Sequence, residues 1–102
     1  MKRKKAESDQ EGFVYFLQGT SSGWVKIGFT TDLKRRLRTQ QGGSPEKLKY
    51  IGYMKGTKTD EKKLHKYFEH VRRRGEWFDA NFFLMSFVCE KCNRDDLEKY
   101  NK

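Results

Sequence analysis

The sequence has 102 residues, a formal net charge of +9 and 15% aromatic residues, which allows one domain with a modest core and argues against wholesale disorder. No apolar run approaches the roughly 18 residues that a membrane span needs, so we expect a soluble protein of the cytoplasm, associated with the nucleoid, or of the nucleus in a eukaryote. The positive charge attracts polyanions, so nucleic acid is the first candidate partner, ahead of an acidic membrane surface.

The N-terminal half begins with a basic arm. Residues 1–11 open with Lys2-Arg3-Lys4-Lys5 and show no apolar periodicity, which predicts disorder. Two β-rich runs follow at residues 13–18 and 24–29, joined by a glycine- and serine-rich turn of hairpin length. Asp32 is a good N-cap for a helix over residues 33–41, which Gly42-Gly43 is expected to end.

The C-terminal half begins with an alternating segment at residues 47–55, which predicts a third strand. Thr59 or Asp60 is the expected cap of a helix that runs to about residue 70. A basic turn at residues 72–75 leads into Glu76-Trp77-Phe78, and a helical region follows from about residue 80.

Because side chains alternate across a strand, the sequence also predicts which residues share a face. In the first strand, Tyr15 shares a face with Phe13 and Leu17, and Val14 and Phe16 face the other way. In the third strand, one face is expected to carry Leu48, Tyr50 and Gly52, and the other Ile51 and Tyr53.

The predicted order is β-β-α-β-α-α, an α+β fold in which helices pack against a small antiparallel sheet of about three strands. We expect a disordered arm at residues 1–11 and a main domain at 12–79. Residues 80–102 are expected to form a C-terminal helical extension packed on the same domain, with a second short helix from residue 95.

Several short motifs follow one another along the main domain. They are Val14-Tyr15, Val25-Lys26-Ile27-Gly28, Arg36, Leu64-His65-Lys66-Tyr67-Phe68 and Gly75-Glu76-Trp77-Phe78. In this order and spacing they resemble the GIY-YIG nuclease superfamily, most closely its short phage and bacterial branch, over residues 13–78. The resemblance implies the α+β fold and a metal-dependent nuclease with catalytic residues in these motifs.

The first motifs supply a phenol and two cations. A free phenol is a poor base at neutral pH, but Lys26, expected beside Tyr15 in the hairpin, and Arg36 could lower its pKa. Tyr15 would then take a proton from the attacking water. Arg36 borders the buried face of its helix, where it could grip a phosphate, whereas Arg35 and Arg38 point outward. Each of these residues could equally be structural: a core tyrosine, a strand lysine and surface arginines.

The later motifs supply a carboxylate and an imidazole. Glu76 stands between Gly75 and an apolar pair, and one carboxylate completed by water suits Mg²⁺ or Mn²⁺. The alternative is a salt bridge from Glu76 to one of the arginines at residues 72–74. His65 shares a helical face with Glu61, so it is either a packed structural residue or a group that contacts phosphate or moves a proton.

Cys89-Glu90-Lys91-Cys92 is half of a zinc site, and no second Cys-x-x-Cys pair accompanies it. His65 and His70 could complete a Cys₂His₂ site, or a dimer could share the metal. We expect zinc to be absent and the thiols to be reduced and without a metal.

The sequence therefore predicts a metal-dependent endonuclease that hydrolyses DNA phosphodiester bonds; the alternative is a non-catalytic DNA-binding module of the same fold. A zinc-stabilised adaptor that binds protein is a third interpretation. The expected catalytic residues are Tyr15, Lys26, Arg36, His65 and Glu76, with the metal on Glu76. The expected DNA contacts are Lys26, Arg35, Arg36, Arg38, Arg72, Arg73 and Arg74. No sequence-reading module is visible, so specificity should be low, or come from a partner or the short C-terminal region. A targeting protein or a second copy in a homodimer is the expected protein partner.

Overall fold

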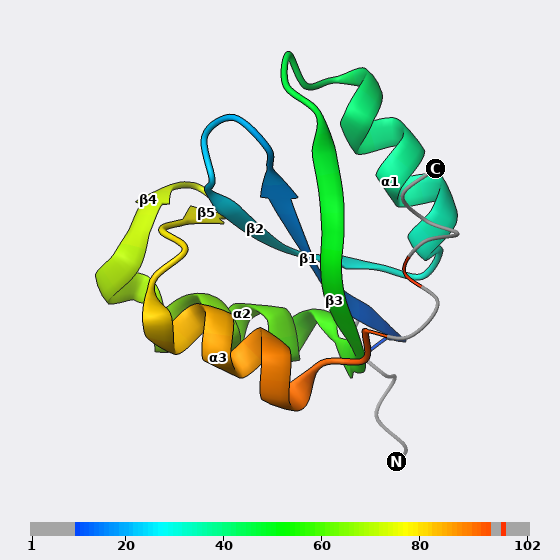
Figure 1. Ribbon diagram of the computed structural model, residues 1–102. Coiled ribbons are helices and arrows are strands. Elements are labelled where there is room, and N and C mark those ends of the chain that lie inside the picture. The colour runs from blue at the N-terminus through cyan, green and yellow to red at the C-terminus, as the bar shows by residue number, and fades with distance from the viewer. Residues whose placement is uncertain (1–9, 95–96, 98–102) are drawn as a thin grey trace.

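The structure is a computed structural model that describes residues 10–94 and residue 97 (Figure 1). The predicted arm, apart from residues 10 and 11, and the predicted helix from residue 95, apart from residue 97, lie outside the described residues. The strands are β1 Glu11–Gly19, β2 Val25–Thr30, β3 Leu48–Thr57, β4 Arg72–Arg74 and β5 Trp77–Phe78. The helices are α1 Leu33–Gly42, α2 Lys58–Tyr67, the short 3-10 helix η2 Glu69–Val71, and α3 Phe82–Lys91.

The five strands form one antiparallel sheet in the order β3-β1-β2-β5-β4. This confirms the α+β class and adds two short strands to the three predicted ones. The predicted turn at residues 72–75 is instead strand β4 followed by a tight turn at Gly75, whose φ is +53°. Within β2, only Val25 and Lys26 pair with β5, so the rest of β2 has no neighbouring strand on that side among the described residues.

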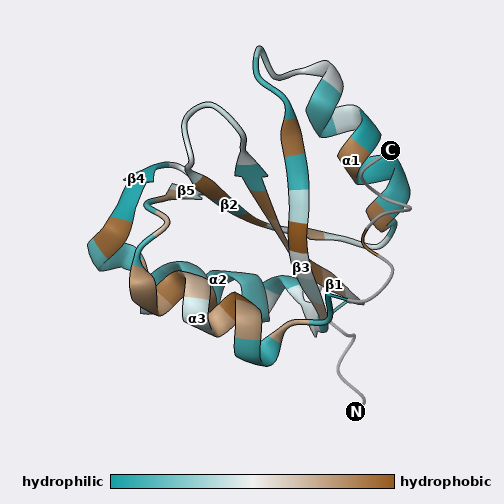
Figure 2. Ribbon diagram, viewed as in Figure 1, coloured by the Kyte–Doolittle hydropathy of each residue, from teal (hydrophilic) through white to brown (hydrophobic). Residues whose placement is uncertain are grey.

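Helices cover both faces of the sheet (Figure 1). Val14 and Phe16 point toward α2 and α3, where they share a core with residues such as Phe68 and Leu84. Tyr15 and Leu17 point toward α1 and share the second core with Leu33, Leu37, Leu48 and Tyr50. The predicted alternation of the first strand is therefore confirmed. Helix α3 is mostly apolar, whereas α1 and α2 carry largely hydrophilic surfaces (Figure 2).

The predicted faces of the third strand are correct only at its start. The β1–β3 register shifts between Phe16, which pairs with Gly52, and Leu17, which pairs with Tyr50. This β-bulge turns Gly52 toward α3, where an added Cβ would lie 2.9 Å from the Cβ of Cys92, and turns Tyr53 toward the α1 side. The strand alternation rule fails there because a bulge inserts one extra residue.

The helix boundaries follow local capping chemistry. The Asp32 side chain accepts from the Arg35 amide at 3.1 Å, as expected for the N-cap of α1. Helix α2 begins earlier than predicted because Thr57 is its cap. The Thr57 hydroxyl accepts from the Asp60 amide, and the Asp60 carboxylate accepts from the Thr57 amide at 2.8 Å. Helix α2 ends at Tyr67 rather than near residue 70, where η2 takes over.

Candidate active site

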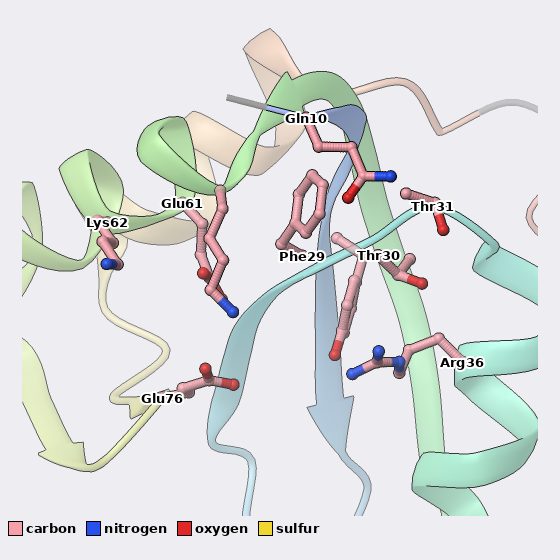
Figure 3. Close-up of a pocket in the computed structure, with 10 residues that line it drawn as sticks. Gln10, Phe29, Thr30, Thr31, Arg36, Glu61, Lys62 and Glu76 are labelled. Carbon is pink, nitrogen blue, oxygen red and sulfur yellow. The ribbon is translucent and has the colours of Figure 1, made fainter. Parts of the chain in front are cut away.

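An open cavity of about 480 Å³ lies where the edge of β2 is not covered by β5 (Figure 3). Side chains from β1, α1, α2 and the β4–β5 turn meet there. Its lining residues are Gln10, Tyr15, Phe29, Thr30, Thr31, Arg36, Lys58, Glu61, Lys62 and Glu76. Three of the predicted site residues, Tyr15, Arg36 and Glu76, are therefore brought together.

Tyr15 is 1% exposed and lies opposite Gly28 of β2. A Cβ at position 28 would overlap the Cζ and hydroxyl oxygen of Tyr15, so the close approach of the ring requires glycine there. Burial raises the pKa of Tyr15 to about 12, although the nearby Arg36 guanidinium opposes the rise. The predicted lowering of this pKa is wrong, because loss of solvent outweighs one nearby cation.

Arg36 is half-buried on α1 and its guanidinium points into the cavity (Figure 3). Arg35 and Arg38 are exposed, as the helical spacing predicted. Among these three arginines, Arg36 alone lines the cavity. It is therefore the one placed to hold an anion beside Tyr15.

Lys26 does not lie directly beside Tyr15. It pairs with Leu17, and Gly28 takes the position opposite Tyr15, so the predicted register was two residues off. The Lys26 ammonium donates to the Gln40 side chain and lies 3.7 Å from Oε1 of Glu76. Lys26 therefore holds the Glu76 carboxylate from outside the cavity.

Glu76 follows Gly75 in the β4–β5 turn, and its backbone carbonyl accepts from the Ile27 amide at 3.0 Å. This bond ties the turn to β2 and aims the half-exposed carboxylate into the cavity (Figure 3). Within the described part of the chain, its ion pair is with Lys26 rather than with Arg72, Arg73 or Arg74.

Arg72 and Arg73 have other partners, and all three arginines are exposed. Arg72 donates to the Gly75 carbonyl at 2.8 Å, and Arg73 lies 3.5 Å from the Asp79 carboxylate. The alternative salt bridge predicted for Glu76 is therefore replaced by these contacts.

Glu61 is the site residue that sequence reasoning missed. It lies on α2, is 3% exposed, and its carboxylate faces that of Glu76 (Figure 3). One ligand atom from each of Glu61, His65 and Glu76 lies within 4.8 Å of the others. The available signal was a carboxylate one helical turn before a histidine on an otherwise apolar face.

His65 is turned toward the sheet. Its Nε2 lies 2.8 Å from the Ile27 carbonyl oxygen, which can only accept, so the Nε2–H group is the donor. The same Nε2 lies 3.9 Å from the Glu61 carboxylate. His65 thus joins α2 to the open edge of β2 and orients Glu61.

The electrostatics of this cluster suit a cation. Burial raises the pKa of Glu61, and the neighbouring Glu76 carboxylate raises the pKa further. Two facing carboxylates with an imidazole nearby form an oxygen-rich donor set of the kind that Mg²⁺ and Mn²⁺ prefer. The residues present therefore fit a divalent metal ion.

Comparison with known proteins gives one match. The family model described as the T5orf172 domain matches residues 12–97. This chain belongs to the T5orf172 domain family. No curated protein and no solved structure matches it. Membership of this family indicates a DNA-related module.

Two further features of this T5orf172 domain concern membrane spans and the cysteines. Among the described residues, no helix is both long and apolar enough to cross a membrane.

The two cysteines lie on α3, at Cys89, and at its C-terminal end, at Cys92, and neither belongs to the cluster of Glu61, His65 and Glu76. Burial raises the pKa of the Cys92 thiol to about 12, and the exposed Cys89 sulfur accepts from Arg94 at 3.4 Å. In the described ranges, the grouped metal-ligating side chains are Glu61, His65 and Glu76 rather than the thiols.

Replacing Glu61 by glutamine is expected to stabilise the T5orf172 domain near neutral pH by about 3 °C in Tm. The raised pKa of Glu61 means that its contribution to stability is present below the ordinary value of 4.5 and is lost as pH rises through the folded value. The amide keeps the shape and a hydrogen-bond donor for Glu76 but removes the repulsion between the carboxylates.

Thermal melts of wild type and Glu61→Gln across pH 4 to 8 would measure this gain, which should disappear toward the acid end. Glu69→Gln, at an exposed carboxylate on η2, is the matched control and should leave Tm unchanged. A lower Tm for Glu61→Gln near neutral pH would contradict the repulsion between Glu61 and Glu76.

Proposed function

We propose that this T5orf172 domain is a metal-dependent endonuclease that hydrolyses DNA phosphodiester bonds, in the manner of the GIY-YIG nucleases that its motifs resemble. One observation carries the proposal. Tyr15, Arg36, Glu61 and Glu76, from four separate parts of the chain, line one open cavity in a domain of net charge +9. A phosphate gripped by Arg36 would face the carboxylates across that cavity.

The carboxylates support a role for a divalent metal. Mg²⁺ or Mn²⁺ would be held by Glu76, with Glu61 facing it as the second carboxylate. When bound, such an ion neutralises charge on the leaving 3′ oxygen and orients the phosphate. Lys26 is then a positioning residue, since it holds Glu76 from the side and is itself held by Gln40.

The other side chains divide the remaining tasks. The Arg36 guanidinium can donate two hydrogen bonds to the phosphate and stabilise its developing charge. Tyr15, whose pKa is about 12, keeps its proton at neutral pH and acts as a donor rather than a base. Acceptance of the water proton then falls to Glu61, whose carboxylate lines the cavity and faces Glu76.

The second candidate function is DNA binding without cutting. The Lys26 ammonium, 3.7 Å from Glu76, already balances the carboxylate that would hold the metal, and this contact favours a binding module. Both functions predict that the cavity and the exposed arginines contact DNA. They differ in whether the backbone is broken.

Incubation with supercoiled plasmid separates the two. With Mg²⁺ or Mn²⁺ we expect nicked circles from wild type and from Tyr67→Phe, an exposed tyrosine that serves as the control. Tyr15→Phe should nick far more slowly, and chelation should stop the reaction. If the protein shifts plasmid in a gel but nicks it under neither metal, the nuclease proposal fails and the binding module stands.

A further inference from the structure

A second open cavity, of about 420 Å³, adjoins the first. The two share the ion pair described above, because Lys26 lines the second cavity and Glu76 lines the first. The only tryptophans in the sequence, Trp24 and Trp77, both line this second cavity, and both are half-buried.

The strand register builds the second cavity. Lys26 pairs with Trp77, and Trp77 pairs with Arg74, so these side chains form a row across the sheet on one face. The next row holds Gly28 and Tyr15. Two residues along β2 separate the rows, a distance of about 7 Å. A ligand in the second cavity would therefore lie close to an anion held by Arg36 in the first.

The lining combines flat apolar rings with positive charge. Lys26 and the exposed Arg74 supply the positive charge of the lining. Arg73 lies outside the lining, but its guanidinium lies 5.0 Å from the centre of the Trp24 ring. Glu46 also lines the cavity, but its carboxylate accepts from the Ser21 and Ser22 amides at 2.9 and 2.8 Å and is occupied by that turn. Indole faces flanked by cations are the chemistry that binds nucleobases and their phosphates.

We propose that the cavity of Trp24 and Trp77 binds an unpaired base of a single-stranded DNA segment. The neighbouring phosphate then enters the cavity of Arg36 and Glu76, a step that rests on the proposed nuclease function. Bases within a duplex are already stacked on each other, so their faces cannot stack on an indole. The substrate is therefore DNA with unpaired bases beside the scissile phosphate, recognised by structure rather than by sequence.

Tryptophan fluorescence tests this directly, because both fluorophores line the proposed base site. The protein is titrated, in metal-free buffer with a chelator, with a single-stranded thymidine oligonucleotide and separately with a blunt-ended, fully paired duplex of equal length. We expect saturable quenching by the single strand and little change with the duplex at concentrations where a gel shift shows it bound. Equal quenching by both, or single-strand binding without quenching, overturns the proposal.

Variants provide a second measure. Arg74→Ala should weaken single-strand affinity about tenfold and duplex affinity less, because it removes the cation that lines the base site beside the indoles. Arg38→Ala, an exposed arginine outside both cavities, is the control and should weaken both DNA forms alike. Trp77→Phe should also lower single-strand affinity, with the melting curve reporting whether the fold is retained. Equal losses for both DNA forms in Arg74→Ala would count against the base site.

These experiments distinguish failure of the base site from failure of the proposed nuclease function. Quenching by single strands with no cutting under either metal would support the base site and overturn the nuclease. Cutting that is equally fast on single-stranded and duplex DNA, with no quenching, would support the nuclease and overturn the base site.

Discussion

Replacing Glu76 by glutamine is expected to slow metal-dependent cutting about a thousandfold. Metal-assisted stabilisation of the transition state is worth several kcal/mol, and an amide cannot hold a divalent ion as a carboxylate does. Binding of DNA in the absence of metal should change little or become slightly tighter, because the substitution removes a negative charge that faces the phosphate. Initial rates of plasmid nicking, with a parallel gel shift in chelator, give both quantities.

Glu69→Gln is the matched control for this experiment. It makes the same chemical change at an exposed carboxylate on η2, away from the cavity lining. Its nicking rate should equal that of wild type. If Glu76→Gln nicks as fast as Glu69→Gln, Glu76 does not hold the metal.

Replacing Gly28 by alanine is expected to disrupt both the fold and the activity. The added methyl would overlap the Tyr15 phenol, whose ring lies across β2, and it would have to displace that ring from the cavity. Overpacking of this kind costs about 2 kcal/mol. Denaturant unfolding should show this loss, and the surviving folded protein should nick plasmid about a hundredfold more slowly because the phenol and Arg36 no longer align.

Gly42→Ala is the control, since an added Cβ there meets no atom within 4 Å and the residue lies at the end of α1. It should leave the nicking rate unchanged and should not lower the stability, since alanine favours a helix more than glycine does. Combining Gly28→Ala with Tyr15→Ala should cost little more stability than Tyr15→Ala alone, because the clash is with that ring. Additive losses in the double variant would show that Gly28 is needed for some other reason.

Patterns that depend on neighbouring residues could be predicted from the sequence. The alternation of Val14, Tyr15, Phe16 and Leu17 placed each of these side chains on its observed face. Asp32 was identified as a cap because its role needs only the next few amides. The same logic failed at Gly52, because a bulge is set by the pairing of β1 with β3 rather than by the local sequence.

The candidate site, too, could be predicted from the sequence only in part. The order of the motifs predicted that Tyr15, Arg36 and Glu76 belong to one site, although they lie far apart in the sequence. In the structure, all three line one cavity. Glu61 was missed because its burial beside Glu76 arises only when α2 crosses the open edge of β2. The pKa of Tyr15 was predicted in the wrong direction because its sign depends on how deeply the ring is buried, which the strand pattern does not give.

The most direct measurement for the proposed site is the cleavage rate of Arg36→Ala under single-turnover conditions, at protein concentrations that saturate the DNA. Arg38→Ala, on the same helix but exposed, is the comparison. With the scissile phosphate in this cavity, the saturated rate of Arg36→Ala should fall about a hundredfold or more, whereas Arg38→Ala should need more protein yet reach the wild-type rate. A saturated rate for Arg36→Ala equal to that of wild type would place the reacting phosphate elsewhere on the protein.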